Sequence, residues 1–574
     1  MNTSAAHPQP LDAAWHAAWH EALAAHTEGR HEAALGALER VLHAQPAHAR
    51  ALELAARTLA GGAPDRAAAP FATPDAQAQA YRGLGAWLYR RGRFAAASHA
   101  YRRVLSIRPD DMSARADLAL ALMNDGCANE AEAELSRALE IDPHHPGVLF
   151  NQGLLMWRVG RLAQAEAAYL AVLAQHPDHV AAWNNLGLLY KEMNRLPESE
   201  AACRRALALD DSHPEIHNNL GNALWQLGQV EASIEPYRRA LALRPDYAAA
   251  RVNLALPLLR LGAYEAAWPL YEARHEPSMG EGGVARPPVP YPQWQGEALA
   301  GKSILVWPEQ GLGDCLQFCR YVPMLKALGA AQVSIACAPA LARLFETLAG
   351  ADRVIALDGR GIIERHDFWC LTMSLPLRFG TTVASIPARV PYLHANEAAA
   401  QAWRARLPAG ALKVGLVWAG NPSEDKAGSH AIDQRRSLDA RAFVPLLRTP
   451  GVTFVSLQLG ATTRPQIAGL PAALRPFDPM DEVRDFADTA AIVANLDLVI
   501  TVDTSMAHLA GALGKPVWVL SRYGACWRWL GDGDDSPWYP TARLFRQGAN
   551  GAWDDVLRRV EEALAARARH AGGE

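Results

Sequence analysis

The chain has 574 residues, more than one ordinary domain, and this length predicts about three or four domains. Half of the residues are apolar and a fifth are charged, which is the composition of a globular protein and excludes wholesale disorder. The 56 basic and 60 acidic residues give a formal net charge of -4, a balance that argues against a dedicated nucleic-acid binder. No uninterrupted apolar run is long enough for a transmembrane helix, so no membrane span is expected.

The first residues, MNTSAAHPQPLDAAWHAAWHEAL, do not combine a basic segment with a following apolar segment, so no secretory signal is predicted. The seven cysteines are scattered and form no CxxC pair, so neither a zinc site nor a disulfide framework is expected. Together these features predict a cytoplasmic protein without a metal site.

Internal repeats dominate the first half of the chain. Residues 1–74 are expected to form N-terminal helices with one degenerate repeat, followed by a Gly/Ala/Pro-rich linker. In residues 75–276, prolines recur at intervals of 34, 34 and 68 residues, and this spacing aligns six units that begin at 78, 112, 146, 180, 214 and 248. Positions 8 and 20 of every unit are small, and position 15 is Gly or Asn, which suits the left-handed residue that ends a helix. The pattern resembles tetratricopeptide repeats and predicts an α-solenoid.

An asparagine column repeats at the sixth position of four successive units, at Asn151, Asn185, Asn219 and Asn253. The first helices of a two-helix solenoid line its concave surface, so one column predicts a row of side chains along the groove. An amide can hold a peptide main chain without reading its sequence, because it carries both donors and an acceptor. The alternative is that these residues cap or bridge neighbouring helices, which would produce the same period.

After a Pro/Gly-rich linker at 277–299, short apolar runs alternate with helical stretches. Strands are expected at 303–307, 332–336, 353–357, 413–418, 452–457, 497–501 and 516–520, and helices between them. This alternation predicts parallel sheets with helices on both faces, and the series restarts near Lys413, so two domains fit better than one. Ligands of such sheets bind in the loops that follow the strands.

Two of these loops carry candidate ligand-binding residues. One lies in the first expected domain and the other near the start of the second. In the loop after 303–307, Gly311 and Gly313 permit a close approach of the backbone, and Asp314 stands where a helix begins. The alternative for Asp314 is simple capping of that helix. The loop after 413–418 is long and basic, with Lys426, His430, Arg435 and Arg436, and it is either a phosphate site or an ordinary solvated loop.

The loop after 497–501 reads TVDTSMAHLAGALGKP. Asp503 ends the strand, Thr504 and Ser505 begin a helix, and His508 follows one turn later on the side of Thr504. Free N–H groups, two hydroxyls and a helix N-terminus predict an anion site, with a carboxylate beside it for a sugar hydroxyl. The alternative is that Asp503 or Thr504 only caps this helix, but capping would not explain His508.

Residues 300–574 resemble glycosyltransferase family nine, the ADP-heptose lipopolysaccharide heptosyltransferases, on two marks. These are Gly313–Asp314 before a helix, and the pattern Asp503–Thr504 with His508 before the last strands. The chain departs from the family in having Ser505 in place of Gly and Gln317 in place of His, which leaves the acceptor open. The whole layout resembles bacterial tetratricopeptide-repeat glycosyltransferases.

This resemblance implies a GT-B fold of two facing Rossmann-like domains, an acceptor-side domain at 300–395 and a nucleotide-sugar domain at 396–574. It also implies an inverting, metal-independent glycosyltransferase with a nucleotide-sugar as co-substrate, no other cofactor, and Asp314 as general base. The residues expected to bind the nucleotide-sugar are Lys426, Arg436, Ser437, Gln458, Asp503, Thr504, Ser505 and His508.

The repeat sequence NNLGNALWQLGQVEASIEPYRRALALRPDY resembles the repeats of protein O-GlcNAc transferases, which implies a polypeptide acceptor in the solenoid groove. We therefore expect transfer of a sugar to a hydroxyl of a polypeptide. Two alternatives stay open: a lipopolysaccharide or small-glycan glycosyltransferase whose repeats serve homo-oligomer assembly, and a non-catalytic repeat scaffold.

Overall fold

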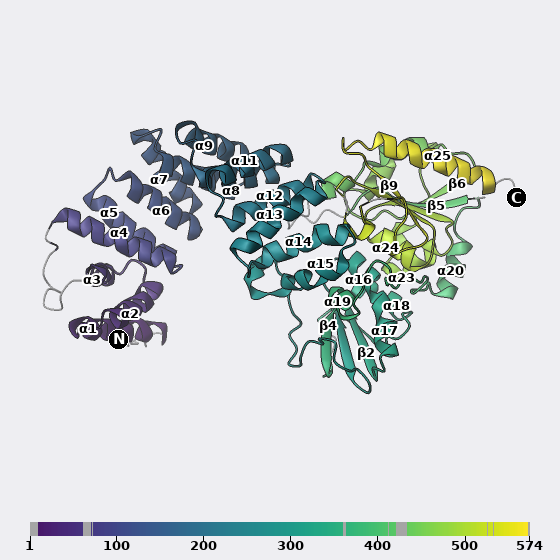
Figure 1. The fold of residues 1–574 in the computed structure, drawn as a ribbon, viewed down its shortest axis with the longest axis horizontal. Coiled ribbons are helices and arrows are strands. Elements are labelled where there is room, and N and C mark those ends of the chain that lie inside the picture. Colours follow the sequence, from purple (N-terminus) through teal and green to yellow (C-terminus); the bar gives the residue numbers. More distant parts are fainter. Residues whose placement is uncertain are drawn as a thin grey trace, which may run out of the picture. The chain divides into compact units, whose positions relative to one another are not determined.

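The computed structural model describes residues 10–60, 71, 73–359, 363–410, 412–420, 433–524, 526–531 and 533–571. The chain forms two compact units, one of Met1–Met193 with Arg204–Asp210, the other of Asn194–Cys203 with Asp211–Glu574. Each unit is described by itself, and Figure 1 labels their helices and strands. No helix of the described residues has the length and apolar character that crossing a membrane requires.

The first unit consists of helices that pair in antiparallel fashion along the chain. They are α1 (Pro10–Thr27), α2 (His31–Ala44), α3 (Ala49–Leu59), α4 (Pro74–Arg90), α5 (Phe94–Ile107), α6 (Met112–Asn124), α7 (Ala128–Ile141), α8 (Pro146–Arg158), α9 (Leu162–Gln175) and α10 (Val180–Glu192). The next helix, α11 (Leu196–Leu209), is divided between the two units. The 34-residue period therefore forms helical hairpins, as the proline spacing predicts.

The small residue at position 8 has a direct packing reason. A Cβ on Gly153 would lie 2.6 Å from the ring of Tyr169, which stands at position 24 of the same repeat. The pair Gly221 and Tyr237 repeats this arrangement at 2.5 Å. The glycine thus makes room for a buried tyrosine that joins the two helices of one repeat.

The second unit continues the repeats and then changes to α/β structure. Its repeat helices are α12 (Pro214–Gln226), α13 (Val230–Leu243), α14 (Ala248–Arg260) and α15 (Tyr264–Tyr271). Short 3-10 turns, η2 (Glu272–His275) and η3 (Pro277–Gly282), follow them.

The first sheet contains β1 (Ser303–Trp307), β2 (Gln332–Cys337), β3 (Arg353–Ala356) and β4 (Phe368–Leu371) in the order β3-β2-β1-β4. The second contains β5 (Leu412–Val417), β6 (Val452–Ser456), β7 (Leu498–Val502), β8 (Val517–Ser521) and β9 (Ala542–Arg546) in the order β6-β5-β7-β8-β9. Every strand pair is parallel. Helices of this region include α16 (Leu312–Phe318), α17 (Val322–Ala327), α18 (Pro339–Phe345), α20 (Glu397–Arg404), α23 (Phe486–Val493), α24 (Ser505–Ala512) and α25 (Asp554–Ala571).

The strand orders determine where a ligand can bind. In each sheet the chain first adds strands on one side of the starting strand and then crosses to the other side, between β1 and β4 and between β5 and β7. A crevice opens at the carboxyl ends of the strands at such a switch point. The loops that follow β1, β5 and β7 are the loops that the sequence analysis selects.

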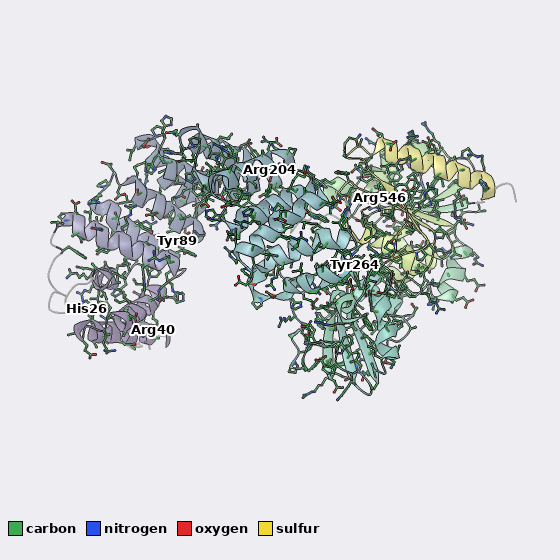
Figure 2. All side chains as sticks on the ribbon, viewed as in Figure 1. His26, Arg40, Tyr89, Arg204, Tyr264 and Arg546 are labelled. Carbon is green, nitrogen blue, oxygen red and sulfur yellow. The ribbon has the colours of Figure 1, made fainter. Side chains whose placement is uncertain are left out.

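The last repeat helices share one hydrophobic core with both sheets. Trp268 of α15 is buried and donates its indole N–H to the carbonyl of Thr381 (2.9 Å). Tyr264, labelled in Figure 2, accepts the indole N–H of Trp538 (3.1 Å), which follows β8. These contacts are far apart in the sequence, so the end of the solenoid is an integral part of the α/β unit.

A buried ion pair strengthens this junction. Arg274 of η2 binds Glu309 through two hydrogen bonds of 2.8 and 2.9 Å, and the Glu309 side chain is fully buried. Glu309 also accepts the backbone N–H of Met373 (2.7 Å). Because Glu309 lies in the loop after β1, the ion pair holds this loop to the last turn of the solenoid.

The segment at 277–299 is more than a spacer between domains. The backbone of Trp294 donates to the carbonyl of Trp369 in β4 (2.7 Å), and the N–H of Trp369 donates to the carbonyl of Pro292 (3.0 Å). Tyr291 and Trp294 are buried. The proline-rich segment is therefore extended chain that packs on the edge of the first sheet.

Candidate functional site

A cavity of about 610 Å³ lies at the carboxyl ends of the strands in the second unit. Its walls come from the loop between β1 and α16, the loop between β7 and α24, the segment after β8, and the repeat helices α12 and α14. The predicted residues that line it are Gly311, Gly313, Asp314, Arg436, Asp503, Thr504, Ser505 and His508. Three separate loops of the sequence thus meet in one space.

Asp314 is held from two sides. Its Oδ2 accepts the backbone N–H of Gly311 (2.8 Å), which caps α16, and its Oδ1 forms an ion pair with Arg528. The side chains of Asp314 and Arg528 are 16% and 9% exposed. Capping, the alternative named above, is therefore present, but the ion pair inside the cavity is not a capping interaction.

The loop between β7 and α24 places an anion-binding backbone in the cavity. Thr504 is the N-cap residue of α24, and its hydroxyl accepts the N–H of Met506. Ser505 begins the helix, and the carboxylate of Asp503 has no hydrogen bond or ion pair with any described residue. The helix N-terminus and the open carboxylate therefore both face the cavity.

His508 is buried at 5% exposure and stacks on Trp529, with ring centroids 5.5 Å apart and planes 12° apart. Its Nδ1 lies 3.0 Å from the hydroxyl of Tyr539. Burial, with the charges of Arg528 and Arg320, holds the pKa of His508 well below its ordinary value, so the ring is neutral at neutral pH. A Cβ on Gly313 would lie 2.8 Å from His508 Cδ2, which explains the glycine.

Three arginines supply positive charge. Arg436 donates to the carbonyl of Asp503 (2.9 Å) and pairs with Asp433 (2.9 Å). Arg522 forms no ion pair within the described part of the chain, and burial lowers its pKa, which the charge of Asp503 only partly offsets. Arg528 is the partner of Asp314, whose charge raises the pKa of Arg528 despite its burial. A desolvated cation without a counter-ion favours an anionic ligand.

The sequence analysis missed Arg522 and Arg528. Arg522 directly follows β8, which lies beside β7, so the rule that strand ends bear ligands could have selected it. Arg528 has no such signal, because only the folded chain brings it to Asp314, 214 residues away.

Other predicted residues lie elsewhere. Lys426 and His430 are outside the described residues. Ser437 does not line the cavity, and its hydroxyl accepts the N–H of Gly420 (3.0 Å). Gln458, expected at the wall of the nucleotide site, is 1% exposed, and its amide binds the backbone of Trp418 and Ala419. These contacts tie the loop after β5 to β6, which is a structural role.

The asparagine column connects neighbouring repeats. Asn151 is 8% exposed and donates to the carbonyl of Ala116 (2.8 Å), while Asn253 donates to Asn218 Oδ1 (2.9 Å). In both cases the partner stands 35 residues earlier, on the first helix of the preceding repeat. Asn185 and Asn219 are half-buried. The bridging alternative thus accounts for the amide groups of Asn151 and Asn253.

All seven cysteines are free. Within the described ranges, no group of three or more His, Cys, Asp or Glu side chains has an arrangement that could hold a metal ion.

Comparison with known proteins identifies the repeats. Tetratricopeptide-repeat families match residues 88–149, 150–214 and 214–247. Protein FlbA of Caulobacter vibrioides is 31% identical over 318 residues, which is 52% of this chain and 52% of FlbA. The chain therefore spans about half the length of this curated relative.

Three solved structures resemble part of the chain. PilF of Pseudomonas aeruginosa is 21% identical, with 35% of this chain and 89% of PilF covered and a TM-score of 0.31. MamA of Desulfovibrio magneticus is 22% identical (29% and 96% covered, TM-score 0.27). A tetratricopeptide-repeat protein of Thermus thermophilus is 26% identical (32% and 99% covered, TM-score 0.29). Residues 88–247 of this chain thus consist of tetratricopeptide repeats.

Proposed function

We propose that the protein transfers a sugar, with inversion, from a nucleotide-sugar to a hydroxyl of a polypeptide. One observation carries this proposal: a single cavity combines an anion site, an ion-paired carboxylate and side chains of the repeat helices. Tetratricopeptide repeats bind protein partners along their surface, and here the last repeats form part of the cavity wall. A polypeptide bound to these repeats would reach the anion site directly.

The diphosphate of the nucleotide-sugar would bind at the N-terminus of α24. The first N–H groups of this helix and the hydroxyl of Ser505 are suitable donors, and Arg436 and Arg522 supply charge from either side. The unpaired carboxylate of Asp503 would accept a hydroxyl of the sugar. Protein groups of this kind stabilise the charge that develops on the leaving diphosphate.

Asp314 would act as the general base. It would take the proton of the acceptor hydroxyl while the oxygen attacks the anomeric carbon, and the bond between that carbon and the diphosphate oxygen would break with its electron pair on the diphosphate. Both oxygens of Asp314 are engaged in the ligand-free protein, one by Gly311 and one by Arg528. A bound diphosphate would compete for Arg528 and thereby release Oδ1.

The acceptor would enter along the repeat helices. Trp225 of α12, together with Val252 and Leu256 of α14, contributes apolar side chains to the wall of the cavity. The indole N–H of Trp225 has no partner among the described residues. An apolar wall with one free donor suits an amino-acid side chain and its peptide group better than it suits a strongly hydrated glycan.

A thermal-shift screen of the purified protein against UDP-, GDP- and ADP-sugars tests the proposal, because a ligand that binds only the folded state raises the melting temperature. Release of nucleoside diphosphate from the effective donor then tests catalysis, and labelling of protein in a cell extract tests the acceptor class. If no nucleotide-sugar shifts the melting temperature or is hydrolysed, the proposal is wrong.

A non-catalytic scaffold is the second candidate, and the specific observation in its favour is the full engagement of Asp314. In a scaffold this carboxylate would serve only to cap α16 and to neutralise Arg528. Binding of a polypeptide without hydrolysis of any nucleotide-sugar would favour this function.

A further inference from the structure

We propose that His508 is a neutral hydrogen-bond donor whose Nε2–H points into the cavity, and that Tyr539 is the positioning residue that selects this tautomer. The inference deepens the proposed function, and its second part rests on it, because the oxygen that would receive the hydrogen bond belongs to the diphosphate or the sugar. It also assigns the role of general base to Asp314 and excludes His508 from it.

The first step concerns the two nitrogens of the ring. Nδ1 faces the hydroxyl of Tyr539 at 3.0 Å. On the other edge, Cδ2 and Nε2 lie 2.8 and 3.6 Å from the position of a Cβ on Gly313, beside the Asp314 loop. Nε2 has no hydrogen bond with a described residue, and His508 lines the cavity. The ring therefore has one nitrogen for the protein and one for a ligand.

The second step concerns the direction of the bond between Tyr539 and His508. A carboxylate or carbonyl at Nδ1 would require a proton on Nδ1 and leave Nε2 as a base, whereas a phenol can donate. The hydroxyl of Tyr539 lies 3.0 Å from Nδ1 of His508 and 3.4 Å from the hydroxyl of Tyr392, and it also accepts a hydrogen bond from Arg320, which has no acceptor to offer in return. The imidazole nitrogen is the nearer and the better acceptor.

Tyr392, another neighbour of the Tyr539 hydroxyl, already has hydrogen-bond partners elsewhere. Its own proton is used in a hydrogen bond to the carbonyl of Leu316 (2.9 Å), and its oxygen accepts Nη2 of Arg320 (2.9 Å). Arg320 is 3% exposed, lies 4.6 Å from the centre of the Tyr539 ring, and forms no ion pair with a carboxylate of the described residues. Tyr392 therefore has little need of a proton from Tyr539, which leaves that proton for His508.

The charged groups near His508 disfavour its protonated form. Besides Tyr539, the neighbours of His508 are the ring of Trp529 and the cations Arg528 and Arg320, which disfavour the imidazolium. Burial raises the pKa of Tyr539, so it stays protonated and remains a donor. A neutral ring with a fixed Nε2–H can donate to an anionic oxygen without carrying a charge of its own.

The tautomer can be measured without any substrate. In the full-length protein labelled with ¹⁵N-histidine, the signals of His508 are identified by their loss in His508→Gln and by their contacts with Trp529 in the wild type. We expect the nitrogen that couples to Hδ2, which is Nε2, to be the protonated one. A protonated Nδ1 in the wild type would overturn the inference.

Two variants test the role of Tyr539. Tyr539→Phe removes the hydroxyl and should shift His508 towards a mixture of tautomers. Tyr392→Phe is the matched control, because it removes a neighbouring buried hydroxyl that does not contact His508, and it should leave the tautomer unchanged. Equal tautomer populations in Tyr539→Phe and the wild type would refute the positioning role.

The ligand part is tested with inorganic pyrophosphate. His508→Phe removes the donor and should weaken pyrophosphate binding by about five- to tenfold, whereas the mixed tautomers of Tyr539→Phe should weaken it by only about twofold. If the wild type shows the expected tautomer but binds neither pyrophosphate nor any nucleotide-sugar, the proposed function fails while the tautomer assignment stands. If pyrophosphate binds equally to the wild type and to His508→Phe, the hydrogen bond does not go to the diphosphate. If the effective nucleotide-sugar also binds equally to the two proteins, the ligand part of the inference is wrong.

Discussion

Asp314 has the capping role that the sequence analysis named as the alternative, and it has a second role that the sequence does not predict. It caps α16 through Gly311, and it neutralises a buried arginine that the sequence does not reveal. Breaking a buried ion pair by removing one charge costs about 3–5 kcal/mol of stability. Mutation of Asp314 therefore affects both stability and turnover, and the two effects must be measured separately.

For Asp314→Asn we expect turnover to fall by about 100-fold or more, because an amide cannot take the proton of the acceptor hydroxyl. Affinity for the nucleotide-sugar should not decrease, because Arg528 no longer has to leave a carboxylate in order to bind the diphosphate. The amide can still accept the N–H of Gly311, so α16 should keep its cap, although the melting temperature should decrease. Full activity of the folded variant would leave Asp314 with only its structural roles.

The anion site is tested by the double variant Thr504→Ala with His508→Ala, in which nucleotide-sugar binding should be lost. Loss of the N-cap alone costs about 1 kcal/mol, so the ligand-induced shift should be compared and not the melting temperature itself. Thr489→Ala is a suitable control, because Thr489 is a buried helical threonine outside the cavity. A shift like that of the wild type would mean that the anion site lies elsewhere.

Glu272 makes stability depend on pH. Burial alone would raise the pKa of Glu272, but hydrogen bonds and charges from His275, Arg274 and Ser374 outweigh burial and lower the pKa to about 2. Because the pKa of Glu272 is lower in the folded protein, the ionised carboxylate stabilises the fold when the pH is above the pKa of the unfolded chain, near 4.5. This contribution is lost as the pH falls towards 2. It amounts to about 3 kcal/mol.

Denaturation of the wild type and of Glu272→Gln between pH 6 and pH 3 checks this prediction. The variant should have the lower free energy of unfolding at pH 6, and the difference between the two proteins should become smaller as the pH falls. A gap that is constant with pH would show that the carboxylate does not titrate as expected.

At the scale of elements, the sequence predicts most strands well and misses two. Seven of the strands lie within one or two residues of the expected ranges, because continuous apolar runs mark a strand that is buried on both faces. The strands β4 and β9 were missed. The run of β4 is apolar but only four residues long, and β9 carries arginine at both its second and its last position, which interrupts its apolar run.

The part of the candidate site that lies in loops directly after strands could be predicted from the sequence. The loops after β1 and β7 were selected because their positions depend only on local order. Gln458 does not line this cavity, because the direction of its side chain after β6 depends on which backbone groups need partners, here those of Trp418 and Ala419. Arg528 needs tertiary structure to be found.

The asparagine column gives a prediction at this scale. Asn151→Ala and Asn253→Ala should each cost about 1 kcal/mol, because each removes a hydrogen bond between successive repeats. Chemical denaturation monitored by circular dichroism measures the cost. Unchanged stability in both variants would show that the bridges do not contribute.

The column can still hold an acceptor, and the quadruple variant with Ala at positions 151, 185, 219 and 253 tests this. At a temperature where circular dichroism shows the variant to be folded, transfer to polypeptide should be lost while hydrolysis of the nucleotide-sugar continues at the wild-type rate. Equal labelling of extract protein by both proteins would mean that the asparagines only join the repeats.

At the scale of the whole molecule, the cavity and the junction with the last repeats belong to one compact unit. We expect two transitions in calorimetry, because each unit has its own hydrophobic core. A nucleotide-sugar should raise only the transition of the unit that contains the cavity. A single transition would mean that the two units unfold together. An equal shift of two separate transitions would mean that the ligand binds both units.

The last repeats differ from the earlier ones in one further respect. In the earlier repeats the helix-ending glycines, such as Gly92, Gly126 and Gly160, have open space where a Cβ would be. A Cβ on Gly228 would lie 2.5 Å from the ring of Tyr523, which follows β8. The unit that begins at residue 214 therefore contacts the segment after β8 at a position where these earlier repeats have open space. Duplication or loss of whole repeats would leave these contacts unchanged among the units that begin at residues 78, 112 and 146, whereas in the units from 214 onwards it would disrupt the core that they share with the α/β region.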